Sequence, residues 1–135
     1  MGYETRLEGE IVIEPPIRWS EIRESPFLEV NTLKASGRAK DIVFRVFETA
    51  VEQGDGTLIR KEAVALVPTH RRYAGRIVEH LQEVVDAFPR HTFAGRIDAY
   101  GEDTGESVPD VWRLKVVNRV ATRFEPRLVW PDESE

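Results

Sequence analysis

The sequence predicts an α+β fold, a two-layer sandwich in which a mostly antiparallel sheet carries two helices on one face. Three observations lead to this class: several segments alternate apolar and polar residues, one segment carries an apolar stripe at helical spacing, and a Gly-Asp-Gly turn joins two apolar runs. The expected element order is β-α-β-β-α-β, which is ferredoxin-like, plus two C-terminal strands. The 135 residues contain no internal repeat and fit one domain. We expect a single domain over residues 1–131 and an acidic, disordered tail over residues 132–135.

The N-terminal segment 3–13 alternates apolar and charged residues, which predicts a half-buried strand. We expect Pro15 and Pro16 to end this strand, because proline cannot donate to a strand ladder. One or two helical turns that end at Pro26 follow. Residues 28–40 have no sustained period and indicate a surface loop.

Residues 41–53 and 57–67 predict a β-hairpin. The first run carries apolar residues on both faces near its start, which is typical of a central strand that is covered on both sides. We expect Asp55-Gly56 to supply the positive φ values that a tight hairpin turn needs.

The second half of the chain predicts one long helix and three strands. The helix begins after Thr69, which can cap it, and ends at Pro89. Its apolar stripe consists of Tyr73, Ile77, Leu81, Val84 and Phe88. The strands are expected at residues 92–100, 111–117 and 120–130, with a loop at 101–110 and a short turn at Asn118-Arg119.

Composition excludes several classes of protein. The chain has no cysteine, which rules out a disulfide framework, a thiolate nucleophile and an iron–sulfur cluster. No apolar run approaches the roughly 18 residues of a membrane-spanning helix, and we expect a cytoplasmic protein that does not bind a membrane. The net charge of −5 argues against general nucleic-acid binding, which favours a basic domain.

The residues that carry a family resemblance lie in four segments between positions 2 and 132: GYETRLEGEIVIEPPIRWSEIRESPF, VVDAFPRHTFAGRIDAYGED, DVWRLKVV and PRLVWPD. Together they resemble a small conserved family of uncharacterised proteins from Streptomyces-type actinobacteria and their phages. The resemblance implies a cytosolic bacterial or phage accessory protein. It implies no activity and therefore assigns no catalytic residue.

No known catalytic motif is present, and the three histidines do not form a site. His70 and His91 flank the predicted helix, so they lie roughly 30 Å apart and cannot share a metal. We interpret His80 as a structural histidine at the edge of the apolar stripe. An acidic cluster, with Asp98 and the loop 102–110, could hold a cation such as calcium, but a solvated hairpin loop fits it better. We therefore lean towards a non-catalytic protein with no cofactor and no metal.

One group of basic residues lies where a helix usually carries acidic ones. His70, Arg71, Arg72 and Arg76 lie at the N-terminus of the predicted long helix, where helices favour acidic residues. These arginines either pair with acids elsewhere in the fold or bind an anion. The ligand-binding residues that we predict are Arg71, Arg72 and Arg76.

Three functions remain open after these observations. The first is an interaction module that binds another macromolecule, which we expect to be a protein. The second is a binding protein for an anionic ligand, a nucleotide or a phosphorylated metabolite, at the N-terminus of the long helix. The third is an enzyme with an unrecognised site. The partner and the oligomeric state do not follow from the sequence. Of the three tryptophans, we expect Trp130 to be the exposed one.

Overall fold

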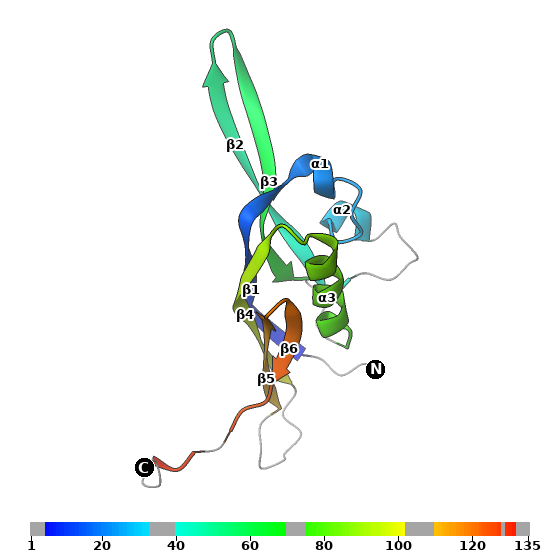
Figure 1. Cartoon of the computed structure of the whole chain (residues 1–135), viewed down its shortest axis with the longest axis vertical. Helices are drawn as coiled ribbons and strands as arrows, with labels where there is room; N and C mark the ends of the chain where they lie inside the picture. The colour runs from blue at the N-terminus through cyan, green and yellow to red at the C-terminus, as the bar shows by residue number, and fades with distance from the viewer. Residues whose placement is uncertain (1–4, 33–39, 70–74, 102–109, 128, 132–135) are drawn as a thin grey trace.

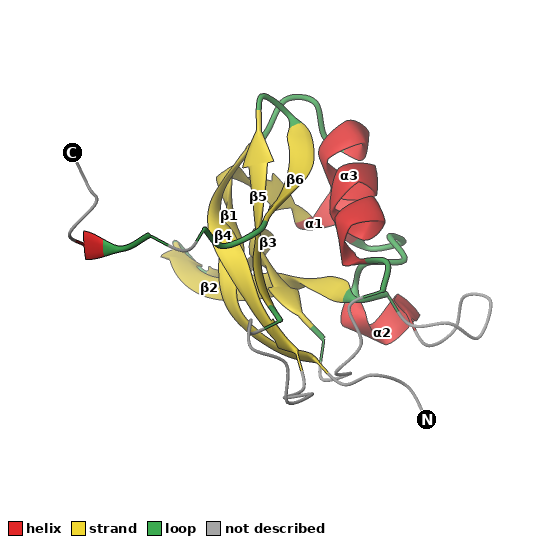
Figure 2. Ribbon diagram, turned by 90° about the horizontal axis from the view of Figure 1, so that it is seen from below, coloured by secondary structure: helices red, strands yellow, loops and turns green. Residues whose placement is uncertain are grey.

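The structure is a computed structural model that describes residues 5–32, 40–69, 75–101, 110–127 and 129–131. Its elements are β1 (Thr5–Arg18), α1 (Trp19–Ile22), α2 (Glu29–Thr32), β2 (Ile42–Gln53), β3 (Gly56–Pro68), α3 (Ile77–Ala87), β4 (Thr92–Gly101), β5 (Val111–Val117) and β6 (Val120–Phe124). The strands form one antiparallel sheet in the order β2-β3-β1-β4-β5-β6 (Figure 1). The helices lie on one face of this sheet (Figure 2).

The predicted ferredoxin-like fold with two helices is wrong, because the described residues form mostly a six-stranded antiparallel sheet with three short helices. Strands account for 58% of the described residues and helices for 18%. The connection from β1 to β2 contains two separate four-residue helices, where a ferredoxin-like fold has one full helix. Pro26 lies between the two, and the residues after it lack the apolar stripe that would extend a helix. Among the described helices, α3 is the longest, with 11 residues.

Strand β1 continues through Pro15 and Pro16 to Arg18, so the prediction that these prolines end it is wrong. Its register against β3 shifts between Val12 and Ile17. Both prolines lie inside this irregularity and have no partner in the register with β3 or β4. Their missing N–H groups therefore remove no hydrogen bond from the ladder, and the strand resumes after them.

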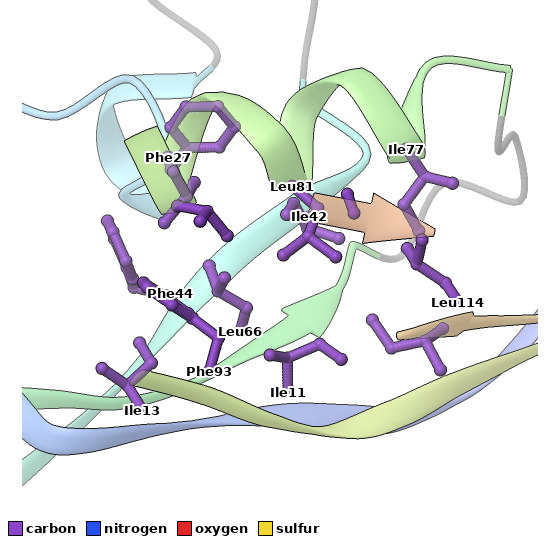
Figure 3. Close-up of a cluster of buried hydrophobic side chains, with 14 of the residues drawn as sticks. Ile11, Ile13, Phe27, Ile42, Phe44, Leu66, Ile77, Leu81, Phe93 and Leu114 are labelled. Carbon is purple, nitrogen blue, oxygen red and sulfur yellow. The ribbon is translucent and has the colours of Figure 1, made fainter. Parts of the chain in front are cut away.

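The core fills the space between α3 and the facing side of the sheet (Figure 3). Ile77, Leu81 and Val84 are fully buried on α3, which confirms the predicted stripe at these positions. Phe88 is half-buried against the same cluster, and Tyr73 lies outside the described residues. The sheet contributes Ile11, Ile13, Ile42, Phe44, Leu66, Phe93, Ile97 and Leu114.

Helix α3 begins at Ile77 with Arg76 as its N-cap, whereas the sequence predicted a start after Thr69. Thr69 instead ties the end of β3 to the start of β2: its N–H and its hydroxyl donate to the carbonyl oxygen of Asp41 at 3.0 and 3.3 Å. Residues 70–74, between this tie and the helix, lie outside the described residues.

Two glycines allow β1 and β4 to approach closely in the middle of the sheet. Gly9 lies opposite Ile97, and Gly95 lies opposite Ile11. Both glycines have a positive φ, 111° and 104°. A Cβ atom on either one would collide with a backbone carbonyl oxygen of the facing strand, so only glycine fits here.

Strand β2 lies at one edge of the sheet, so the prediction of a central strand over residues 41–53 is wrong. Its first residues, Ile42 to Phe44, are buried nonetheless. The segment before α2 covers them: the N–H of Phe44 donates to the carbonyl oxygen of Phe27 at 2.9 Å. An edge strand that a loop covers on one side gives the same apolar pattern as a central strand, which explains the error.

Two hairpins of the sheet, β2–β3 and β5–β6, turn over two residues. The β2–β3 turn consists of Gly54 and Asp55, and its positive φ of 50° falls at Gly54, not at Asp55-Gly56 as predicted. The β5–β6 turn consists of Asn118 and Arg119, with φ values of 49° and 64°. Positive φ at both central residues is the pattern of a type I′ hairpin turn.

Candidate functional site

A two-stranded ribbon projects from one end of the sheet (Figure 1). We call it the arm and define it as residues 48–61. Strand β3 pairs with β1 only as far as Glu62, opposite Arg18, whereas its pairing with β2 continues to Gln53 and Gly56. Within the arm, therefore, each strand has only the other as its neighbour in the described sheet.

Three large apolar side chains are exposed on or beside the arm. Phe47 is 54% exposed, Leu58 45% and Ile59 62%. The register places Phe47 and Leu58 on one face of the ribbon and Ile59 on the other. Because an isolated two-stranded hairpin is marginal in water, the arm adds little to the stability of the body. Apolar side chains gathered on such an element are typical of a surface that binds another macromolecule.

Lys61 fixes the base of the arm to α1. Its ammonium group lies 3.1 Å from Glu48 and 4.9 Å from the ring centre of Trp19, which packs against the core. Beside this contact, a hollow of about 780 Å³ runs along β2, and its walls include Phe47 and Val30. The exposed apolar surface of the arm thus continues into a recess at its base.

The sequence pattern did contain a signal for the arm that the prediction missed. The half of each strand near the core is almost free of charge, as in IVF of β2 and AVALV of β3. The distal halves, ETAVEQ and TLIRKE, mix charged with apolar residues. This change of pattern along each strand marks the point where the covering layers end.

The predicted anion site at the start of α3 is described only at Arg76. Its guanidinium group donates from Nε and Nη2 to Oε2 of Glu79, at 3.0 and 2.9 Å. Arg71, Arg72 and His70 lie outside the described residues. Arg76 therefore pairs with an acid on its own helix, and the grouping of the three arginines stays a prediction.

The start of α3 is held instead by Asp41, just before β2. Oδ2 of Asp41 accepts from the N–H of Arg76 at 2.9 Å, and the N–H of Asp41 donates to Nδ1 of His80 at 3.0 Å. His80 is only 5% exposed, so it is buried and does not lie at the edge of the stripe as expected. Burial lowers the pKa of His80 below its ordinary value, and the nearby carboxylate of Asp41 opposes this. A neutral ring that accepts at Nδ1 acts here as a structural link.

The acidic cluster is described at Asp98 and Asp110, while residues 102–109 lie outside the description. Arg113 donates to both carboxylate oxygens of Asp98, at 2.6 and 3.2 Å, and this lowers the pKa of Asp98. Asp98 thus forms an ion pair that links β4 to β5. Among the described residues, no group of three or more His, Asp or Glu side chains is placed to hold a metal ion. Cation binding by the loop stays a prediction.

The remaining sequence predictions concern Trp130 and membranes. Trp130 is 59% exposed, which confirms the expectation. In the part of the chain that the structure describes, no helix is both long enough and apolar enough to cross a bilayer.

The whole chain, residues 1–135, matches the Family of unknown function (DUF6205), and the protein therefore belongs to that family. This confirms the resemblance to a conserved family whose function is not known. No curated protein and no solved structure matches the chain.

Proposed function

We propose that this protein is a non-catalytic interaction module that binds a partner protein through the arm. The observation that carries the proposal is the exposure of Leu58 and Ile59 on a ribbon that leaves the body of the sheet, with Phe47 exposed beside its base. Burial of apolar side chains against a partner is the main favourable contribution to most protein–protein association.

The chemistry of the arm favours a protein over a nucleic acid. Glu48 and Glu52 lie on the same ribbon as Arg60 and Lys61, so no extended basic stripe forms. In addition, the arm has two outer edges without a paired strand in the described sheet. Such edges accept an added strand of a partner, while side chains such as Leu58 select its sequence.

The setting of this function is part of the same proposal. We propose a cytoplasmic accessory protein of Streptomyces-type actinobacteria or of their phages. Support comes from the sequence resemblance, from the excess of arginine over lysine and from the lack of cysteine. Arginine-rich composition is what a GC-rich genome produces.

Site-specific cross-linking tests the proposal. A photo-reactive phenylalanine analogue is placed at Ile59, and in a matched control at Val120, which is 55% exposed on the other hairpin. We expect one discrete protein adduct in host cells from position 59 only. The adduct should disappear when Leu58→Ser is added to the same chain, because this change removes apolar contact area. Adducts that are the same from both positions, or no adduct from position 59, would contradict the proposed function.

A further inference from the structure

A groove with an excess of positive charge lies at the base of the arm. Its volume is about 920 Å³, within the range of roughly 300–1,000 Å³ that is typical of small-molecule sites. Its cationic lining consists of Arg18 at the end of β1, Arg60 and Lys61 of β3, and Arg90 from the loop after α3, with His91 beside it. None of these residues belongs to the exposed apolar set of the arm, so the groove can be tested separately from the proposed function.

The three arginines of the groove differ from most others in the structure. Among the described residues, Arg18, Arg60 and Arg90 have no carboxylate oxygen within 4.0 Å. Six other arginines each lie that close to a Glu or Asp side chain: Arg6, Arg45, Arg76, Arg96, Arg113 and Arg123. The groove therefore gathers guanidinium groups whose donors are not used by an acid of the described chain.

The pairing of β1 with β3 brings two of these arginines together. Arg18 lies opposite Glu62, and Arg60 lies two residues along β3 on the same face. Diagonal neighbours of this kind are roughly 7–8 Å apart across a sheet. Two long guanidinium side chains at that spacing can both contact one anionic group or two adjacent ones.

The loop that carries Arg90 is held in place from two sides. Nδ1 of His91 lies 2.6 Å from the carbonyl oxygen of Pro15, which can only accept, so Nδ1 is the donor. The carbonyl oxygen of His91 accepts from Nη1 of Arg119 at 2.8 Å. Because the loop is fixed before any ligand binds, little conformational entropy is lost when it does.

Two carboxylates, Glu21 and Glu62, also line the groove, and they set the kind of anion that can bind. Four cationic side chains exceed two acidic ones, but a singly charged anion gains little from that difference. Lys61 already pairs with Glu48, which leaves the three arginines as the main donors. A ligand with several negative charges overcomes the two carboxylates by engaging more than one guanidinium group.

We propose that this groove binds a small molecule with two or more phosphate groups, such as pyrophosphate or a nucleoside diphosphate. The planar guanidinium group of arginine can donate two hydrogen bonds to the oxygens of one phosphate group. The volume of the groove suits a molecule of this size. The net charge of −5 disfavours a long nucleic acid, whose affinity depends on an extended basic surface.

Titration calorimetry of the full chain tests the site with pyrophosphate, ADP, inorganic phosphate and a 12-nucleotide single-stranded DNA. We expect pyrophosphate and ADP to bind more tightly than phosphate or the DNA. Arg18→Gln, Arg60→Gln and Arg90→Gln should each weaken pyrophosphate binding about tenfold or more, as expected for the loss of a charge-assisted contact. Glu62→Gln should strengthen it, because a repelling carboxylate is removed. Arg127→Gln, which changes an exposed arginine outside the groove, is the matched control and should leave the affinity unchanged.

A urea midpoint for each variant confirms that it is folded. The variant Arg60→Lys tests whether binding needs the planar guanidinium group or only its positive charge. Partial binding by Arg60→Lys supports the site, since a lysine keeps the charge and loses the planar fork. The proposal is overturned if wild type gives no heat with pyrophosphate or ADP. It is also overturned if Arg127→Gln weakens binding as much as the groove variants, or if the DNA binds most tightly of the four probes.

Discussion

Two hairpins of this chain, β2–β3 and β5–β6, both turn over two residues but lie in opposite environments. The β5–β6 turn is bound to α3: the guanidinium group of Arg119 donates to the carbonyl oxygens of Val85, Phe88 and His91 at 2.6–3.1 Å. The β2–β3 turn projects from the body, and a Cβ atom added at Gly54 would meet no atom within 4 Å among the described residues. One hairpin thus completes the core, while the other extends apolar side chains into solvent. A sheet of this kind needs the first for folding, so the second is where binding is expected.

A pair of leucine substitutions should show the largest difference in stability between the body and the arm. Leu81→Ala on α3 should cost about 2–5 kcal/mol, because a fully buried side chain is lost and a cavity remains. Leu58→Ala on the arm should change stability by less than about 0.5 kcal/mol, since its side chain is 45% exposed. Urea unfolding of both variants gives the two values. Equal losses would mean that the arm packs against something in the folded body.

Loss of the contact between the β5–β6 turn and α3 should have the next largest effect on stability. Arg119→Lys should cost about 1–2 kcal/mol, because the guanidinium group reaches the three carbonyl oxygens from two separate nitrogens, and a compact ammonium group does not span the same acceptors. Arg123→Lys is the matched control, since Arg123 pairs with exposed Glu125. This substitution should change the free energy of unfolding by less than about 0.5 kcal/mol. Unfolding midpoints of the two variants that do not differ would show that Arg119 does not hold the hairpin to the helix.

The link between Asp41 and His80 predicts a pH dependence that belongs to the body. The pKa of His80 is lowered in the folded chain, so the unfolded chain binds a proton first as the pH falls below about 6.5. Stability should therefore fall from that pH downwards until the folded ring is also protonated. His80→Gln keeps an acceptor for the N–H of Asp41 and does not titrate. Urea midpoints between pH 7.5 and 5 should drop more steeply in wild type, and parallel curves would refute the structural role of His80.

Shortening the arm should have the smallest effect on stability. Deletion of residues 50–53 and 56–59 joins Thr49 to Arg60 through Gly54-Asp55. Thr49 and Arg60 are paired in the ladder, and four residues are removed from each strand, so side chains keep their faces. We expect a free energy of unfolding within about 0.5 kcal/mol of wild type. A large loss in thermal denaturation would place the arm among the elements that the fold requires.

The sequence predicted those parts of the fold that depend on local pattern. The stripe of Ile77, Leu81 and Val84 identified α3, and alternation identified the strands. The predictions failed where the outcome depends on tertiary context. Pro15 and Pro16 sit in a register shift that only the neighbouring strands create, and the short helices before β2 replace a crossover helix that the element order suggested.

The candidate sites were harder to predict than the fold, because each depends on residues far apart in the chain. Arg18, Arg60 and Arg90 are brought together by strand pairing and by the loop after α3, and no motif links them. Similarly, nothing local marks Arg119 as the residue that binds the end of α3. Arg71 and Arg72 were conspicuous because they are adjacent in sequence, which is a weaker sign of a site than convergence in space.

The arm-shortened chain offers the most direct test of the central claim, that the arm serves binding and not folding. Wild type and the shortened chain are immobilised at equal amounts, and the recovery of the partner identified by cross-linking at Ile59 is measured. The account predicts that the shortened chain, folded as wild type, loses nearly all of the partner. Full recovery of the partner by the folded, shortened chain would contradict it.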